Sequence, residues 1–314
     1  MDKRVYGVLG VSSIMANWNA DFSGYPKTTS NGDIFGSDKA FKHPMKKMWK
    51  DQGEKVLYIK SLRFEKDKKG IVSLIPKSLK ERYEEIFEVA DLKKNTNAKE
   101  ILTNLFKAVD VKNFGATFAE AGANISITGA VQLGQGFNKY EDCSPHEQNI
   151  LSPFRDATKA TEEKGEAKNS TLGTKVVTDE AHYFYPFVIN PASYDDYVAL
   201  GVTEGYTEED YKKFKETALV SATAFATNAK EGCENEFALF VETDSDLYLP
   251  NLTSYLTFEK GEEKDVITIS AANILDEVKD QIKSIEVYYN PHTTEIVSDI
   301  ENTKYYHIIT RKEV

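Results

Sequence analysis

The sequence is poor in the residue types that mark secreted and membrane proteins. Its 314 residues include two cysteines, Cys143 and Cys233, which lie far apart and form no C-x-x-C pair. This spacing indicates neither a disulfide framework nor a cysteine zinc site, and it suits a reducing, cytoplasmic setting. No apolar run reaches membrane-spanning length, and the amino terminus lacks the apolar core of a signal peptide. We therefore expect no membrane association.

Catalytic and cofactor motifs are also missing. The nearest approach to a GxxxxGK[ST] phosphate loop, Gly129 to Gly134, is followed by Gln135 and Gly136. GxGxxG, HExxH and GxSxG do not occur, and the five histidines show no metal-ligand spacing. His182 lies in an aromatic run and is interpreted as a packed strand residue. No cofactor and no bound metal are expected.

One carboxylate, Asp21, stands in a polar loop and is the residue on which an enzymatic function would depend. No second acid or base accompanies it in the sequence. Aspartate is common in turns because its side chain hydrogen-bonds nearby backbone N–H groups, so this role is favoured. A protein that is not an enzyme is the resulting expectation.

Positive charge is scarce overall but concentrated in one segment. The formal net charge is −11, which argues against non-specific coating of nucleic acid by the whole surface. Residues 37–51 nevertheless carry five lysines against two aspartates. A local basic face on an otherwise acidic protein remains compatible with binding a polyanion.

A helix over residues 37–51 would separate its lysines from its apolar residues. Ser37 is a suitable N-cap. Lys39, Lys42, Lys46 and Lys50 follow at spacings of three, four and four and share one face, while the other face carries Phe41, Met45, Met48 and Trp49. This face is either a solvated lysine stripe or a phosphate clamp. Pro44 predicts a kink, or a helix that begins near His43 and excludes Lys39 and Lys42.

Two further segments carry polar groups suited to a nucleic acid. The loop 16–36 is dense in short polar side chains, and its Trp18, Phe22 and Tyr25 either stack on bases or fix the loop to the body. The glycine-rich stretch 113–137 contains Gln132 and Gln135, which flank Gly134.

The pattern of apolar residues predicts an α+β fold. Strands are expected at 4–13, 54–64, 125–133, 181–190, 235–243, 284–289 and 304–310, and helices at 37–51, 78–90, 97–108 and 208–230. Residues 155–171 are predicted to be an exposed excursion, an extended hairpin with a flexible tip. Without the excursions, the order strand, helix, strand, strand, helix, strand is that of a ferredoxin-like or RRM-type core.

Several long blocks of the sequence resemble one known family. They are SIMANWNADFSGYPKTTSNGDIFGSDKA, GATFAEAGANISITGAVQLGQG, SPFR, TLGTK, DEAHYFYPFVINP, GCENEFALF and LYLPNL. Together they are similar to the crRNA-binding backbone subunit of type I-B CRISPR Cascade, the Cas seven family of the RAMP superfamily. The resemblance extends from about residue 4 to residue 258, and residues 259–314 carry less of it.

This resemblance implies a hand-shaped chain and a role in antiviral defence. It predicts a single RRM-like palm over residues 1–314, with a helical fingers insertion at 65–112 and a β-hairpin thumb at 140–181. Copies would stack as a filament on the spacer of a crRNA and present it to target DNA, beside other Cascade subunits. The expected RNA-binding residues are Asn17, Asn19, Lys27, Ser30, Lys42, Lys46, Lys50, Gln132, Gln135, Arg155, Thr174 and Lys175.

Two other functions remain open at this point. Related filament proteins of type III systems cut target RNA with a loop aspartate, so a RAMP-type ribonuclease using Asp21 and a metal is the enzymatic alternative. A structural protein that only oligomerises is the other. The preferred hypothesis is a non-catalytic subunit that holds any spacer sequence by its phosphates and riboses.

Overall fold

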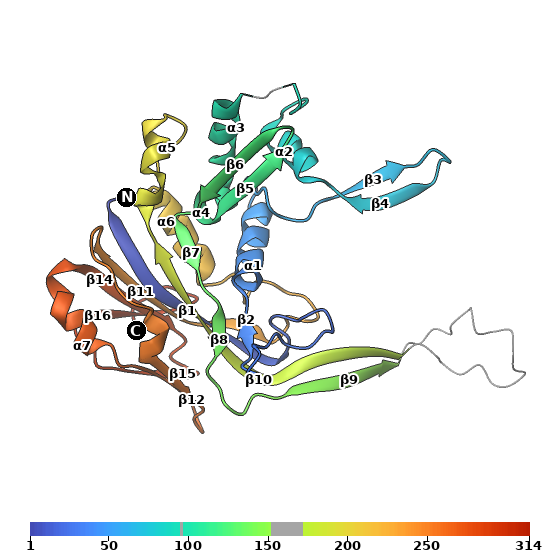
Figure 1. Ribbon diagram of the computed structural model, residues 1–314. Coiled ribbons are helices and arrows are strands. Elements are labelled where there is room, and N and C mark those ends of the chain that lie inside the picture. Colours follow the sequence, from blue (N-terminus) through green and yellow to red (C-terminus); the bar gives the residue numbers. More distant parts are fainter. Residues whose placement is uncertain (95–96, 152–171) are drawn as a thin grey trace, which may run out of the picture.

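The computed structural model describes residues 1–94, 97–151 and 172–314 and is a mixed α/β fold (Figure 1). Within these ranges, one sheet has nine strands, a second has three, and two more are separate hairpins. No described helix is both long enough and apolar enough to span a bilayer. Cys143 and Cys233 are both free thiols.

The large sheet is built around β1 (Lys3–Ala16), which confirms the strand predicted at residues 4–13. β1 pairs antiparallel with β10 (Leu172–Ile189) on one side and with β11 (Cys233–Asp244) on the other. Both faces of β1 are covered, which explains its nearly continuous apolar sequence. The other strands are β14 (Ile282–Tyr289) and β16 (Thr303–His307) beyond β11, and β7 (Val131–Leu133), β8 (Gly136–Asn138), β9 (Pro145–Leu151) and β2 (Phe35–Gly36) beyond β10.

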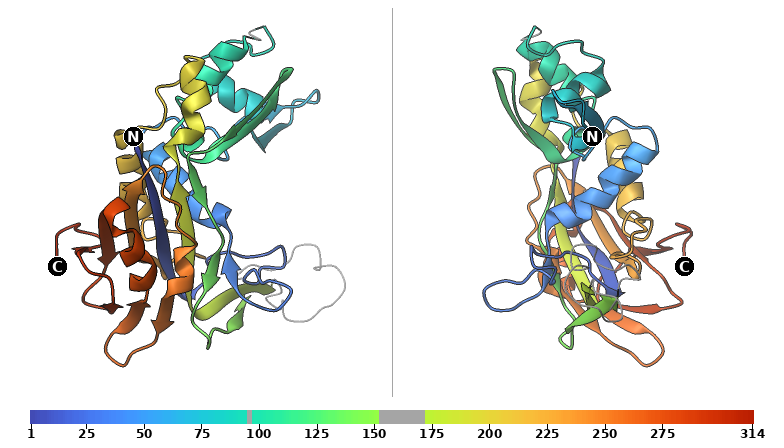
Figure 2. Two further views of the ribbon diagram at one scale, coloured as in Figure 1. Left: turned by 60° about the vertical axis from the view of Figure 1, so that its left-hand side comes forward. Right: turned by 90° about the vertical axis from the view of Figure 1, so that its right-hand side faces the viewer.

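Two helices cover one face of this sheet. α1 (Asp38–Asp51) follows β1 in the chain, and α6 (Glu208–Ala218) connects β10 to β11. Figure 2 shows the two helices next to each other on that face. Their apolar side chains form one core cluster with the strands, including Phe41, Met45, Trp49, Phe214 and Ala218. Strands β11, β1, β10 and β8 lie side by side in this order, and each is antiparallel to its neighbour.

The opposite face of the large sheet carries a smaller sheet. It consists of β12 (Leu256–Glu259), β13 (Asp265–Ile269) and β15 (Thr294–Ser298), accompanied by η3 (Leu252–Tyr255), α7 (Ala272–Leu275) and η4 (Asp276–Gln281). A second apolar cluster fills the space between the two sheets. The described ranges therefore form two cores, which β1 and its neighbours separate.

A further group of elements lies above one end of the large sheet (Figure 1). Its elements are β3 (Leu62–Lys66), β4 (Val72–Pro76), α2 (Leu79–Phe87), α3 (Ala98–Leu105), α4 (Val109–Phe114), β5 (Gly115–Glu120), β6 (Ala123–Thr128), η2 (Pro191–Tyr194) and α5 (Asp195–Ala199). Helices predicted at 78–90 and 97–108 are confirmed. Ser78 and Glu81 form a capping box that fixes where α2 begins.

The strand predicted at 54–64 is wrong, because only its last residues enter β3. Val56 and Leu57 are both buried although they are adjacent, which does not follow the alternation of a half-buried strand. However, the N–H groups of Leu57 and Tyr58 donate to the two carboxylate oxygens of Asp110, at 2.8 Å each, in place of a neighbouring strand. A buried carboxylate from α4 thus takes the hydrogen bonds that a strand would need.

The helix predicted at 208–230 begins as expected but ends early. Thr207 and Asp210 form the capping box at its start. At its end, Asn235 Nδ2 donates to the carbonyl of Ala218, and Asn235 Oδ1 accepts from the N–H of Ala222, each at 2.8 Å. This buried side chain from β11 caps the last turn and redirects the chain.

Candidate nucleic-acid interface

The 16–36 loop is held to the body near its start. Asn17 is buried, and its Nδ2 donates to the carbonyls of Gly24 at 2.9 Å and Val176 at 3.2 Å. Its Oδ1 is buried and has no hydrogen-bond partner among the described residues. Asn17 therefore ties the loop to β10 and sets the position of the rest.

Trp18 fixes the loop and does not face solvent. It is 1% exposed, and its indole Nε1 donates to the buried hydroxyl of Tyr185 at 2.5 Å. The ammonium of Lys230 donates to the carbonyls of Asn17 and Trp18 and lies over the indole ring. Burial lowers the pKa of Lys230. Of the two roles open to Trp18, attachment to the body is the one observed.

The outer part of the loop is a rigid turn that presents Phe22. Asp21 Oδ1 accepts from the N–H and the hydroxyl of Ser23, at 2.8 Å each, and from the N–H of Tyr25 at 3.0 Å. These hydrogen bonds lower the pKa of Asp21, and the bond from the Ser23 hydroxyl has the largest effect. Phe22 is fully exposed at the tip, whereas the Tyr25 hydroxyl donates to Glu147 on β9. The loop thus contacts the arm formed by β9 and β10.

Three predicted residues converge where α1 begins. Ser37 is the N-cap, and its own N–H donates to Asn19 Oδ1 at 2.8 Å. Asp38 pairs with Lys42 at 2.8 Å and accepts a long bond of 3.5 Å from Gln135. Asn19, Lys42 and Gln135 come from three separate segments and meet around Ser37 and Asp38, so the amino end of α1 is one part of the candidate interface.

The lysines of α1 differ in their surroundings. The helix begins at Asp38 and runs through Pro44, so the start near His43 is wrong and all four lysines of the stripe belong to one helix. Lys39 and Lys50 are exposed. Lys46 is mostly buried, 3.4 Å from the carbonyl of Tyr58 and 4.0 Å from the carboxylate of Asp110. Burial lowers the pKa of Lys46 and raises that of Asp110.

The remaining predicted residues fall in three places. Lys27 is partly exposed and Ser30 is exposed, both on the 16–36 loop. Thr174 and Lys175 lie on β10 opposite β9, on the same arm that contacts the loop. Gln132 donates to the carbonyl of Gly129 and lines a separate apolar groove over the large sheet. Arg155 and the predicted hairpin tip lie outside the described residues.

A buried histidine network that the sequence did not reveal lies apart from this loop. His182 Nδ1 is 2.7 Å from Glu236, and its Nε2 is 3.1 Å from Glu180. Glu180, His182 and Asp265 are close enough to hold a metal ion, but Lys260 already pairs with both carboxylates, at 2.7 and 3.1 Å. The ammonium therefore supplies the positive charge there. His182 is a packed strand residue as interpreted, and only the fold brings its partners together.

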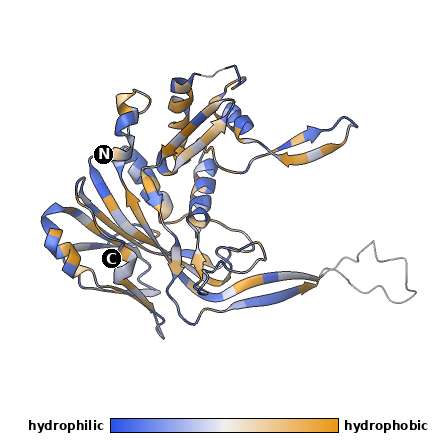
Figure 3. Ribbon diagram, in the orientation of Figure 1, coloured by the Kyte–Doolittle hydropathy of each residue, from blue (hydrophilic) through white to orange (hydrophobic). Residues whose placement is uncertain are grey.

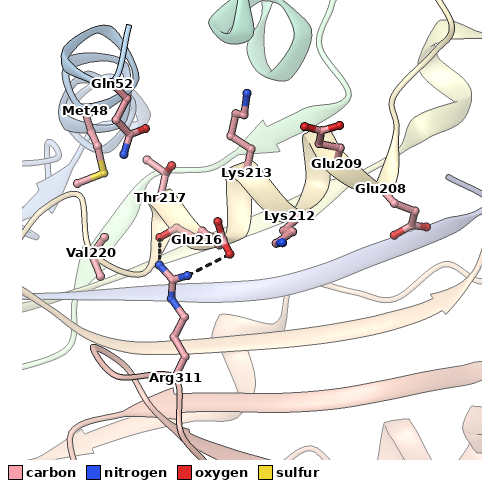
Figure 4. Close-up of a pocket in the computed structure, with 10 residues that line it drawn as sticks. All are labelled: Met48, Gln52, Glu208, Glu209, Lys212, Lys213, Glu216, Thr217, Val220 and Arg311. Atoms are coloured by element: carbon pink, nitrogen blue, oxygen red, sulfur yellow. Dashed lines mark hydrogen bonds and ion pairs between the residues drawn. The ribbon is translucent and has the colours of Figure 1, made fainter. Parts of the chain in front are cut away.

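Figure 4 shows a pocket of about 570 Å³ between α1, α6 and the carboxy-terminal segment. Its charges are largely matched within the chain, because Arg311 pairs with Glu216 at 3.1 Å and Lys213 pairs with Glu54 at 2.5 Å. Both signs alternate along its wall. The pocket therefore offers no concentrated positive charge for a phosphate chain.

A comparison with protein-family models identifies the family of the chain. The family model for CRISPR-associated protein Cas7 matches residues 3–288. A chain of a solved structure described as "CRISPR RNA-guided surveillance complex, pre-nicking" is similar in fold, with a TM-score of 0.52, 14% identity, and coverage of 97% of this chain and 96% of that chain. For a chain of a "CRISPR RNA-guided surveillance complex", the TM-score is 0.48 and the identity 12%, with coverage of 92% and 91%. No curated protein sequence matches. Since the family model spans most of its length, the chain belongs to the CRISPR-associated protein Cas7 family.

Proposed function

We propose that this protein is a non-catalytic crRNA-binding backbone subunit of a CRISPR surveillance complex, of type I-B. Copies assemble along the spacer and present it for pairing with target DNA. The antiparallel order of β11, β1, β10 and β8, with α1 and α6 in the connections, supports an RRM-like palm. Residues 65–112 are then the fingers, and 140–181, which include β9 and the start of β10, are the thumb.

The observation that carries this proposal is the arrangement of the 16–36 loop. Buried bonds from Asn17 and Trp18 hold it between the amino end of α1 and the arm of β9 and β10. Its outer turn is fixed by Asp21 and presents an exposed aromatic ring, Phe22. Surfaces that bind single strands combine aromatic rings, on which bases stack, with cationic groups that follow the phosphates. Here Phe22 supplies the ring, and Lys27 and Lys175 supply positive charge on the loop and the arm.

The residues of this interface divide into two roles. Asn17 and Asn19 position the loop, since their side chains are engaged with the backbone of neighbouring segments. The proposed RNA contacts are Lys27, Ser30, Lys42, Lys50, Gln135, Thr174 and Lys175, with Phe22 added by the structure; Lys46, Gln132 and Arg155 remain in the proposal. Five of the 39 cationic residues of the chain are arginine. Lysine grips phosphate as a point charge, which leaves base edges free for pairing.

Binding of a purified single-stranded RNA at several salt concentrations tests the function. Affinity is expected to fall by about 0.7 log units per log unit of salt for each phosphate that is neutralised. Phe22→Ala should weaken binding by about fivefold or more, because one stacked base contributes about 1–3 kcal/mol. Ile309→Ala, an exposed apolar residue just after β16 at the other edge of the sheet, is the control. Wild-type protein that binds no RNA at moderate salt would refute the proposal.

The same preparation separates this function from the ribonuclease alternative. Protein assembled on RNA is incubated with complementary RNA and Mg²⁺, and both strands are expected to stay intact. One oxygen of Asp21 already accepts three hydrogen bonds within the turn, which supports a structural role. Cleavage that disappears in Asp21→Asn would establish the enzyme instead.

A further inference from the structure

The 16–36 loop has few hydrophobic residues, so apolar packing alone does not decide where it lies. Figure 3 shows a mainly hydrophilic segment between β1 and β2. Phe22 is fully exposed, and the largest buried side chain of the loop is Trp18, near its start. The position of the rest of the loop therefore depends on what holds the backbone beside Trp18.

That backbone is held by the turn that precedes β11. The N–H of Asn17 donates to the carbonyl of Ala229 at 2.9 Å. The N–H of Ile14 donates to the carbonyl of Gly232, also at 2.9 Å. Between these two bonds lies Met15, whose φ of +49° is uncommon for a residue other than glycine and persists only where the surroundings impose it. The turn thus fixes the direction in which the chain leaves β1.

The ammonium of Lys230, in the same turn, binds the loop through two carbonyl groups. Its Nζ donates to the carbonyls of Asn17 and Trp18 and lies 5.7 Å from the centroid of the Trp18 ring. Among the described residues, no carboxylate pairs with Lys230. A charge that is partly removed from water needs acceptors or a counter-ion. The two loop carbonyls therefore take the part that a carboxylate would otherwise play.

Lys230 differs from the lysines that are proposed to contact RNA. Two of its three N–H donors are used by the loop carbonyls, and the indole ring lies against the ammonium. In contrast, Lys50 is exposed and Lys27 is partly exposed. The ammonium of Lys230 is thus better placed to hold the loop than to bind a phosphate.

We propose that Lys230 is a positioning residue for RNA binding, which fixes the start of the 16–36 loop and thereby the place of Phe22 and Lys27. It acts through the backbone of Asn17 and Trp18 and does not contact the strand. Because Lys230 lies 213 positions after Asn17, only the fold brings the two together. The inference rests on the proposed function, since it adds a residue to the interface described there.

Lys230→Met removes the donors and keeps the length of the side chain. Its affinity for single-stranded RNA at a fixed salt concentration should fall by about tenfold or more, because hydrogen bonds from a charged group are stronger than neutral ones. Lys230→Arg should recover most of this loss, since a guanidinium can donate to both carbonyls and stack on the indole. Lys212→Met, at an exposed lysine of α6, removes the same charge and should bind as wild type does. Lys230→Met that binds RNA as tightly as wild type would overturn the proposal.

Indole fluorescence reports the displacement of the loop without RNA. Trp18 contacts Lys230, whereas Trp49 lies in the core and donates to the hydroxyl of Thr217 at 2.8 Å. Lys230→Met should shift the emission to longer wavelength as Trp18 meets water, and Lys212→Met should leave the spectrum unchanged. An unchanged spectrum in Lys230→Met would show that the loop does not depend on this ammonium and would refute the positioning role.

A comparison of double variants separates positioning from direct contact. If Lys230 acts through the loop, Phe22→Ala should cost less affinity in the Lys230→Met background than in wild type, because the ring is already displaced. Lys50→Met, on α1 and outside the loop, should cost the same in both backgrounds. An equal cost of Phe22→Ala in both backgrounds would assign Lys230 to an independent RNA contact and exclude positioning.

The same measurements distinguish this inference from the function on which it rests. Lys230→Gln, which keeps a polar end in the turn, takes the place of Lys230→Met if that variant does not fold. Wild-type protein that binds no RNA would defeat the proposed function and this inference with it. Wild type that binds RNA, together with Lys230 variants that bind equally well, would refute the inference alone.

Discussion

At the scale of single residues, the same lysine spacing leads to different environments. The sequence correctly predicted that Phe41, Met45 and Trp49 pack on one side of α1. It did not show that Lys46 approaches Asp110, because that carboxylate lies 64 positions further along the chain and reaches the lysine only through the fold. Lys42 likewise pairs with Asp38, whereas Lys39 and Lys50 remain exposed.

This difference predicts separable effects of charge reversal. Lys50→Glu should weaken RNA binding without a change in the free energy of unfolding. Lys46→Glu should destabilise the fold by about 3 kcal/mol or more, because it places a second carboxylate beside buried Asp110. Urea unfolding and RNA binding of both variants provide the check. Equal stability of Lys46→Glu and wild type would contradict the structural role of this lysine.

At the scale of elements, local sequence signals set where several helices begin, and distant side chains set where others end. Ser37 was predicted as a cap from the sequence, and Ser78 and Thr207 cap α2 and α6 in the same local way, since a capping side chain lies within three residues of its N–H partner. The early end of α6 depends on Asn235, and the missing strand at 54–64 depends on Asp110. Contacts of this kind produce no periodic pattern of apolar residues in the sequence. The prediction therefore extended the helix at 208–230 and the strand at 54–64 too far.

The junction between the two sheets predicts a pH dependence of stability. Burial lowers the pKa of His182, but Glu236 and Glu180 outweigh it and raise the pKa above 6.5. Its charged form thus stabilises the fold fully below pH 6.5, and this contribution is lost as the pH rises through the folded-state pKa. The ring also stacks on Phe258 of β12 at 3.7 Å, so the effect spans both sheets.

His182→Gln is the corresponding variant. It should lower the free energy of unfolding by about 3 kcal/mol at pH 6, where it leaves Glu236 without its cation, and by less at pH 9. His146→Gln, at an exposed histidine paired with Asp179, is the control. Urea unfolding at several pH values measures the difference between each variant and wild type. A difference that stays constant with pH would exclude the charged imidazole.

At the scale of the whole molecule, the net charge of −11 disfavours non-specific coating of nucleic acid by the whole surface. Long blocks of the sequence resembled one family, and the match of the family model to residues 3–288 shows that the chain belongs to it. The geometry of the interface was not readable, because Asn19, Lys42 and Gln135 meet only once three segments have folded together. Composition and blocks thus predict what kind of molecule this is, and the fold decides which side chains share a surface.

The proposed assembly of copies along the spacer makes a quantitative prediction about RNA length. A contact between two different surfaces of the chain can repeat without limit. Each added stretch of RNA should therefore recruit one more copy at a constant interval, whereas a two-fold dimer would stop at two copies. Native mass spectrometry of wild type on RNAs of increasing length counts the copies directly. RNAs with scrambled sequences serve as controls and should give the same count, since backbone contacts do not depend on base identity. A copy number that stops at two, or that follows sequence and not length, would exclude a repeating backbone and point to a closed or sequence-specific complex.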